Sequence, residues 1–150
     1  MENFTRSNLL RFCYIGESIN DFKKINQQIN IDLLPIKTQL QSNLSKALFD
    51  LNRLSQKEAP QVIILNADLP GNPSLEFLYH YQKHISFNFP EILFYISSIK
   101  NQPINKWKRT FPFLTGLIRK PYMKDNFQAI ATHLLNQFLP PLDLTIDLKS

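Results

Sequence analysis

Cysteine is almost absent from this chain of 150 residues. The single cysteine, Cys13, excludes an intramolecular disulfide framework. A chain of this length can bury one proper hydrophobic core instead, as a single domain does. Because Cys13 lies inside an apolar run, we expect it to be a small buried hydrophobic residue.

Glycine and long apolar runs are also scarce. The chain has three glycines, and Gly16 stands alone, so no glycine-rich phosphate-binding loop follows the first apolar segment. No apolar run reaches the roughly 18–20 residues that cross a bilayer. Residues 1–10 lack the basic start and apolar core of a signal peptide. We therefore expect a cytoplasmic protein in a reducing compartment.

The overall charge is moderately positive. The net charge is +5, with 17 basic and 12 acidic residues, and the basic residues are scattered along the chain. A nucleic-acid-binding protein more often concentrates them in one stripe with a recognisable motif. The charge pattern therefore argues against nucleic acid as the partner and fits a solvated surface.

Short apolar segments alternate with amphipathic ones. Strand-like segments occupy residues 9–15, 33–39, 61–65, 91–97 and 114–119. Helix-like segments occupy residues 19–29, 44–54, 73–85, 103–111 and 126–138, with Ser42 as the expected N-cap of the second. This alternation predicts an α/β fold, with a five-stranded parallel sheet and helices on both faces.

The ends of the predicted strands indicate where a site would lie. Ligands of such sheets bind at the carboxyl ends of the strands. The residues at those ends are Gly16, Glu17, Ser18, Asn66, Ala67, Asp68, Ser97, Ser98 and Lys120. Beyond the last helix, the tail 139–150 alternates apolar and polar residues. It is either a frayed terminus or a strand that pairs with a sheet edge or a second copy.

Several of these features together resemble the receiver domain of two-component response regulators. The most specific ones are "VIILNADLPGNPSLEFL" at 62–78 and "GLIRKP" at 116–121. Receivers carry a phosphoacceptor Asp at the end of the third strand, then a Pro-Gly turn, a Ser or Thr at the end of the fourth strand and a Lys-Pro after the fifth. Pro70, Gly71, Ser97, Lys120 and Pro121 match that pattern. The resemblance implies the flavodoxin-like strand order 2-1-3-4-5, with residues 1–138 as one receiver-like domain and 139–150 as its tail.

Three catalytic positions of the family are altered here. Asn66 stands at the phosphoacceptor position, and an uncharged amide is not expected to accept a phosphoryl group. The acidic pair that helps to hold Mg²⁺ falls on Gly16-Glu17, or on Ile15-Gly16 in a shifted register. At least one carboxylate is missing in either register, so we expect weak Mg²⁺ binding or none. The aromatic switch position is Leu117.

The remaining pocket is therefore predicted to be vestigial. It consists of Glu17, Ser97, Lys120, Pro121 and Asp68. We expect Lys120 to bind the side-chain oxygen of Asn66 or to pair with Glu17. Asp68 is a candidate alternative acceptor, although an Asp at this loop position usually caps a turn or is solvated.

Other side chains that could carry chemistry have simpler interpretations. His80 and His84 have the i, i+4 spacing of metal ligands but lack a nearby third ligand, so we expect surface histidines and no metal site. His133 is expected on the surface of the last helix. Trp107, among basic residues, is either part of a docking patch or a half-buried anchor.

These features predict an atypical receiver domain, not an enzyme, that acts in signal transduction through protein–protein contact without aspartyl phosphorylation. The expected partners are a histidine kinase, another signalling protein or a second copy, through residues 103–135 or the tail. Two alternatives stay open. One is a phosphorylatable receiver with a displaced acceptor, and the other is a flavodoxin-like module that binds a small molecule.

Overall fold

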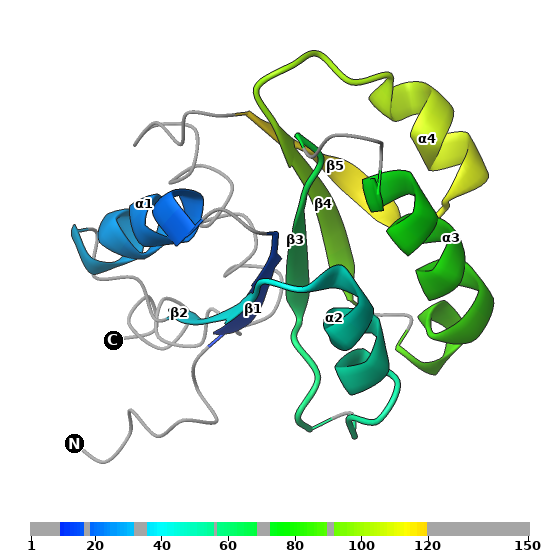
Figure 1. Cartoon of the computed structure of the whole chain (residues 1–150), viewed down its shortest axis with the longest axis horizontal. Coiled ribbons are helices and arrows are strands. Elements are labelled where there is room, and N and C mark those ends of the chain that lie inside the picture. Colours follow the sequence, from blue (N-terminus) through cyan, green and yellow to red (C-terminus); the bar gives the residue numbers. More distant parts are fainter. Residues whose placement is uncertain are drawn as a thin grey trace, which may run out of the picture.

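The computed structural model describes residues 10–16, 19–31, 36–55, 57–68, 73–89 and 92–119. Five strands form one sheet in the order β2-β1-β3-β4-β5, and every neighbouring pair is parallel. Helix α1 covers one face of the sheet, and α2, α3 and α4 cover the other (Figure 1). The predicted α/β fold and strand order are confirmed.

The strands lie close to their predicted positions. They are β1 (Leu10–Ile15), β2 (Ile36–Gln41), β3 (Val62–Asn66), β4 (Leu93–Ser98) and β5 (Leu114–Arg119). The central strand β3 is buried at all of its positions, as its β-branched run predicts for a strand covered on both faces. Strands β2 and β5 form the two edges of the sheet.

The helices also follow the predicted segments. They are α1 (Ile19–Ile31), α2 (Leu44–Leu51), α3 (Pro73–His84) and α4 (Ile104–Thr110), with a short 3₁₀ helix, η2, at Ser86–Asn88. The predicted N-cap of α2 is wrong by one residue. The cap is Asn43, whose side-chain oxygen accepts a hydrogen bond from the Lys46 amide, and Ser42 lies outside the helix.

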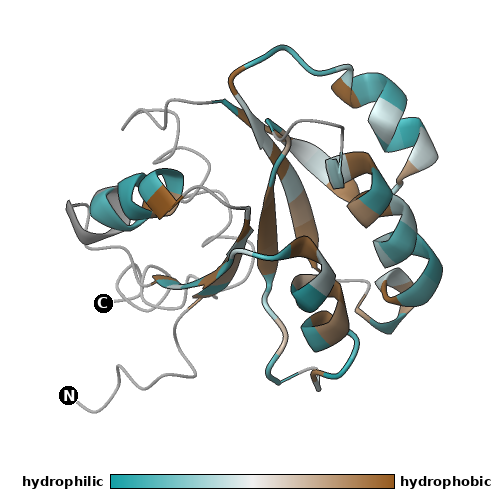
Figure 2. Cartoon of the chain, viewed as in Figure 1, coloured by the Kyte–Doolittle hydropathy of each residue, from teal (hydrophilic) through white to brown (hydrophobic). Residues whose placement is uncertain are grey.

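Two hydrophobic clusters fill the space between the helices and the sheet. Alternate residues of β3 point to opposite faces, so Ile63 and Leu65 pack beneath α2–α4 while Val62 and Ile64 join the cluster on the α1 side. The central strands β3 and β4 are correspondingly apolar, and the outer faces of the helices are mostly polar (Figure 2). Cys13 is buried in the first cluster, as expected.

Several predicted features lie outside the described residues. They are the helix 126–138, the tail 139–150, and the positions Glu17, Ser18, Pro70, Gly71, Lys120, Pro121 and His133. Within the described segments, no helix combines the length and apolar character needed to span a membrane.

Strand β5 joins the sheet with an irregularity. Phe94 pairs with Leu114, but the next residue of β4, Tyr95, pairs with Gly116. Thr115 is therefore an extra residue on β5, which is the arrangement of a β-bulge. The strand resumes a regular register through Ser98 and Arg119.

Candidate functional site

The candidate site lies at the carboxyl ends of β1, β3 and β4. Asn66 is the last residue of β3 and is paired in register with Ser97 of β4. Both side chains are buried, with 3% and 0% of their surface exposed. On the other side of β3, Ile15 pairs with Leu65, so Gly16 follows beside Asn66. The strand-end rule thus brings Gly16, Asn66 and Ser97 together at one edge of the sheet.

The side chain of Asn66 is used to shape the loop that follows it. The Asp68 amide donates a hydrogen bond to Asn66 Oδ1 at 3.0 Å. The Ala67 amide donates to the carbonyl oxygen of Ser97 at 2.9 Å, which extends the pairing of β3 with β4 by one residue. A side-chain oxygen that binds the amide two residues ahead is an Asx turn, and it favours Asn or Asp at this position. Asn66 therefore has a structural role at the end of β3.

Gly16 lies in very close contact with Asn66. A Cβ atom placed on Gly16 would lie 2.7 Å from Asn66 Cβ and 3.3 Å from the ring of Tyr14. The Gly16 amide donates to the Gln41 carbonyl at 3.0 Å, which fixes the backbone against β2. Any side chain at this position would have to displace Asn66 or Tyr14. The structure thus leaves no room for a carboxylate at position 16.

Asp68 connects the loop after β3 to the loop after β4. Its Oδ1 accepts a hydrogen bond from Ser98 Oγ at 2.6 Å, and its Oδ2 accepts one from the Ile99 amide at 2.9 Å. Ser98 Oγ in turn accepts bonds from the Lys100 amide and from Gln102 Nε2, both at 3.1 Å. We call these five residues the Asp68 latch. The carboxylate satisfies two donors that would otherwise be left near the end of a buried strand.

The latch combines a charged acceptor, Asp68, with a buried donor, Ser98. Hydrogen bonds to a charged acceptor contribute about 1.5–3 kcal/mol each, more than neutral ones. Ser98 is fully buried, so loss of its acceptor would leave a buried hydroxyl proton without a partner. In the sequence, Ser98 is recognisable as a strand-end residue, but its role as the donor to Asp68 is not. The available signal was the pair of serines at the end of β4, at 97 and 98.

The other predicted side chains are spread over the fold. Leu117 lies on β5, half-buried, and packs against the cluster beneath α2–α4, as does the half-buried Trp107 of α4. His80 and His84 are exposed, with their rings stacked at 6.2 Å between centroids. Among the described residues, no three His, Cys, Asp or Glu side chains gather as a metal site would require.

Cys13 does not supply a nucleophile. Its side chain is buried on β1, and burial raises the pKa of the thiol to about 12. The thiolate is the reactive form, so Cys13 is chemically silent near neutral pH. The polar groups at the carboxyl ends of the strands are therefore the candidate site in the described part of the chain.

Comparison with solved structures yields a consistent group of neighbours. No protein-family model matches the chain, and no curated protein sequence matches it. A two-component response regulator from Cytophaga hutchinsonii is 15% identical with a TM-score of 0.71, covering 85% of this chain and 98% of its own. One from Legionella pneumophila is 19% identical with a TM-score of 0.69, covering 86% and 99%. The BeF3-activated receiver domain of DrrB is 16% identical with a TM-score of 0.62, covering 85% and 98%. The chain therefore has the fold of the CheY-like response regulator receiver domains.

Proposed function

We propose that this chain is an atypical receiver domain that acts in signal transduction by binding other proteins, without phosphorylation of an aspartate. In this proposal it is not an enzyme and has no cofactor. It works in the cytoplasm, with a histidine kinase, another signalling protein or a second copy of the chain as its partner. The receiver fold supports the signalling role, and the residues at the strand ends support the loss of phosphorylation.

The observation that carries the proposal is the position of Asn66. A receiver presents a carboxylate at the end of its third strand, and this chain presents a buried amide whose oxygen accepts the Asp68 amide. An uncharged amide is a poor nucleophile and cannot form the acyl phosphate that a carboxylate forms. The position therefore keeps the geometry of the switch without its reactive group.

The surroundings of Asn66 also argue against a magnesium site. Mg²⁺ needs several hard oxygen ligands and gives up its water reluctantly. Both registers of the acidic pair place one of its two acids at Gly16, where a Cβ would lie 2.7 Å from Asn66 Cβ. The second position of the pair is Glu17 in one register and Ile15, a fully buried core residue, in the shifted register. The pair therefore keeps one carboxylate at most.

Asp68 is the obvious candidate for a displaced phosphoacceptor. Both of its carboxylate oxygens already accept hydrogen bonds, from Ser98 Oγ and the Ile99 amide. An attack on phosphorus would require at least one of these bonds to break, and bonds to a carboxylate lower its nucleophilicity by stabilising its charge. The latch thus favours a structural role for Asp68.

Treatment with acetyl phosphate distinguishes a receiver that is not phosphorylated from one that uses Asp68 as a displaced acceptor. We would incubate the full chain with acetyl phosphate and Mg²⁺, follow its intact mass, and run a receiver with an intact acceptor Asp in parallel. We expect no gain of a phosphoryl group in the wild type or in Asp68→Asn. A gain in the wild type that is lost in Asp68→Asn and cleaved by hydroxylamine would instead establish Asp68 as an acceptor.

A second pair of variants tests why the switch is silent. Asn66→Asp restores one carboxylate, and we expect little or no phosphorylation because position 16 still lacks its acid. Gly16→Asp combined with Asn66→Asp tests the crowding, and we expect a destabilised protein. Efficient phosphorylation of the single Asn66→Asp variant would show that the amide alone silences the site.

A further inference from the structure

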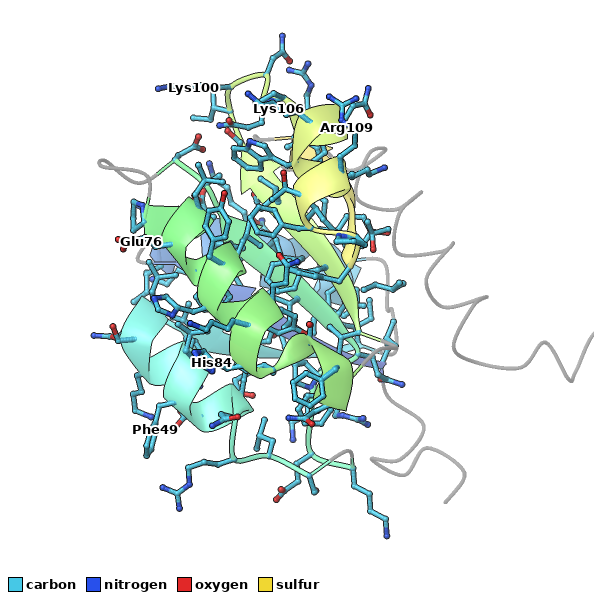
Figure 3. The ribbon with its side chains drawn as sticks, turned by 90° about the vertical axis from the view of Figure 1, so that its right-hand side faces the viewer. Phe49, Glu76, His84, Lys100, Lys106 and Arg109 are labelled. Carbon is cyan, nitrogen blue, oxygen red and sulfur yellow. The ribbon has the colours of Figure 1, made fainter. Side chains whose placement is uncertain are left out.

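The outer side of α3 carries an exposed stripe that ends in opposite charges. Glu76, Tyr79, His80 and Lys83 follow the spacing i, i+3, i+4 and i+7, which places them along one side of a helix. All four are exposed, and we call them the α3 stripe. Helix α3 lies at the front of Figure 3, with Glu76 near its beginning. The stripe therefore faces solvent in the described part of the chain.

The middle of the α3 stripe is an aromatic ring that the fold holds in place. Tyr79 has 58% of its surface exposed. Its ring packs edge-to-face on Phe111, with 4.9 Å between the ring centroids, and Phe111 is itself buried. A side chain that is already held in place loses little conformational freedom when a second molecule covers it. Tyr79 is thus suited to anchor a protein interface, where tyrosine is enriched.

The charges at the two ends of the stripe are available to a second molecule. Glu76 and Lys83 are seven residues apart, about 10 Å along the helix axis. The ion pair found among the described residues joins Lys46 to Asp50 on α2. Within the described segments, no charged side chain pairs with Glu76 or Lys83.

This order of charges is complementary to itself. Two copies of α3 can meet antiparallel about a two-fold axis at the middle of the stripe, so that Glu76 of each copy lies opposite Lys83 of the other. Both pairs then bring opposite charges together, whereas a parallel arrangement would bring like charges together. The two Tyr79 rings lie beside the axis, at the centre of the contact, where interfaces concentrate most of their binding energy. The charges therefore favour the antiparallel pair.

We propose that the α3 stripe is the interface of an antiparallel dimer of this chain. This inference rests on the proposed function and specifies both the partner, a second copy, and the surface, which differs from residues 103–135 and from the tail. One helix offers less area than the roughly 800 Å² that each partner contributes to a standard interface. We therefore expect a weak dimer, with a Kd of about 0.1 mM, so that a sample of about 5 μM is mainly monomeric.

Overall charge works against this dimer and provides a test of its specificity. The net charge of +5 repels two copies, most strongly at low salt. At about 0.15 M salt the screening length is about 8 Å, so this long-range repulsion weakens while pairs in direct contact are retained. Lys83→Glu lowers the net charge by two and would strengthen association if overall repulsion were the dominant effect. The α3 stripe predicts that the same variant weakens it.

Sedimentation of the full chain between about 5 μM and about 1 mM measures the dimer. Glu76→Lys and Lys83→Glu each place like charges at both symmetric contacts, and we expect each to weaken association about tenfold or more. The charge swap Glu76→Lys/Lys83→Glu keeps the net charge and restores both pairs, so its Kd should lie within about threefold of the wild-type value. The control Lys24→Glu makes the same charge change at an exposed position of α1, and it should change Kd by about twofold or less.

The aromatic anchor is tested separately from the charges. Tyr79→Ala removes the ring and should weaken the dimer about tenfold, whereas Tyr79→Phe keeps the ring and should stay within about twofold of the wild type. Glu76 and Lys83 also suit the dipole of α3 at the ends where they lie. Circular dichroism would therefore check that every variant is folded.

Three results would overturn the proposal: a wild type that stays monomeric up to about 1 mM, wild-type affinity in both single charge variants, or a charge swap that does not regain association. Phosphorylation is followed separately by intact mass. A phosphorylated wild type would refute the proposed function and leave the dimer measurement intact. A monomeric wild type would refute the dimer and leave an unphosphorylated receiver that binds a different protein.

Discussion

Replacing Asp68 with alanine removes the acceptor that joins the loops after β3 and β4. Two of the hydrogen bonds that this carboxylate accepts are described, and their losses have different costs. Ser98 is fully buried, so its hydroxyl proton is left without an acceptor at a cost of about 1–3 kcal/mol. The Ile99 amide lies near solvent, where water can replace the carboxylate, so its share is about 1 kcal/mol. The expected loss of unfolding free energy is therefore about 2–4 kcal/mol.

Urea unfolding measures this loss of unfolding free energy. A double-mutant cycle shows how much of it comes from the interaction between Asp68 and Ser98. Ser98→Ala removes the donor, and Asp68→Ala/Ser98→Ala removes both partners. We expect a coupling energy of about 1–2 kcal/mol between the two positions. Glu76→Ala is the matched control, because Glu76 is exposed on α3 and has no described hydrogen bond through its carboxylate. Hydrogen exchange of the Ile99 amide should be faster in Asp68→Ala and unchanged in Glu76→Ala.

The reasoning would fail if Asp68→Ala and Glu76→Ala destabilised the protein equally. It would also fail if the cycle gave a coupling energy close to zero, because the 2.6 Å contact between Asp68 and Ser98 would then contribute nothing. A large loss for Asp68→Ala without coupling would point to a different partner of the carboxylate. Each of these results can be distinguished in one set of unfolding curves.

Three further predictions concern the core and the strand ends. Gly16→Ala should lower the unfolding free energy by about 1–3 kcal/mol, because the new Cβ would lie 2.7 Å from Asn66 Cβ. An unchanged urea midpoint would contradict this and show that Asn66 and Tyr14 can move aside at no cost. Cys13, with its pKa raised to about 12 by burial, should resist iodoacetamide in the folded protein and react in urea; rapid labelling without urea would contradict its burial. Burial also raises the pKa values of Tyr81 and Tyr95 above the ordinary 10.0. All three groups bind their protons more tightly when folded, so Tm should fall as the pH rises above about 9. In Tyr81→Phe, Tm should decrease less steeply above about pH 10. A wild-type Tm that stays constant up to about pH 11 would refute the predicted pH dependence.

The fold was largely predictable because its strands are buried on both faces. Such strands form short apolar runs, and the run 114–119 coincides with β5. Strand β2 was located less well. The sequence favours residues 33–39, whereas β2 runs from Ile36 to Gln41. The strand continues two residues beyond the predicted end, because an edge strand is half-exposed and mixes polar with apolar residues, so its apolar pattern does not mark where it ends.

The candidate site was predictable in its position but not in its contacts. The strand-end rule places Asn66 and Ser97 at one edge of the sheet, where they are neighbours in register. The latch depends on a pairing between Asp68 and Ser98, which are 30 residues apart. Each is an ordinary loop or strand-end residue when considered alone. Their contact follows from the register of β3 with β4, which apolar periodicity does not determine.

The two edges of the sheet also affect how the protein behaves at high concentration. An open strand edge can pair with another molecule and start aggregation. On β2 the exposed Lys37 and Gln39 place a charge and an amide along the edge. On β5 the extra residue Thr115 interrupts the regular ladder with β4, and bulges increase strand twist and so hinder flat stacking. Among the described strands, one edge is thus protected by polarity and the other by shape, and both devices work against edge-to-edge aggregation.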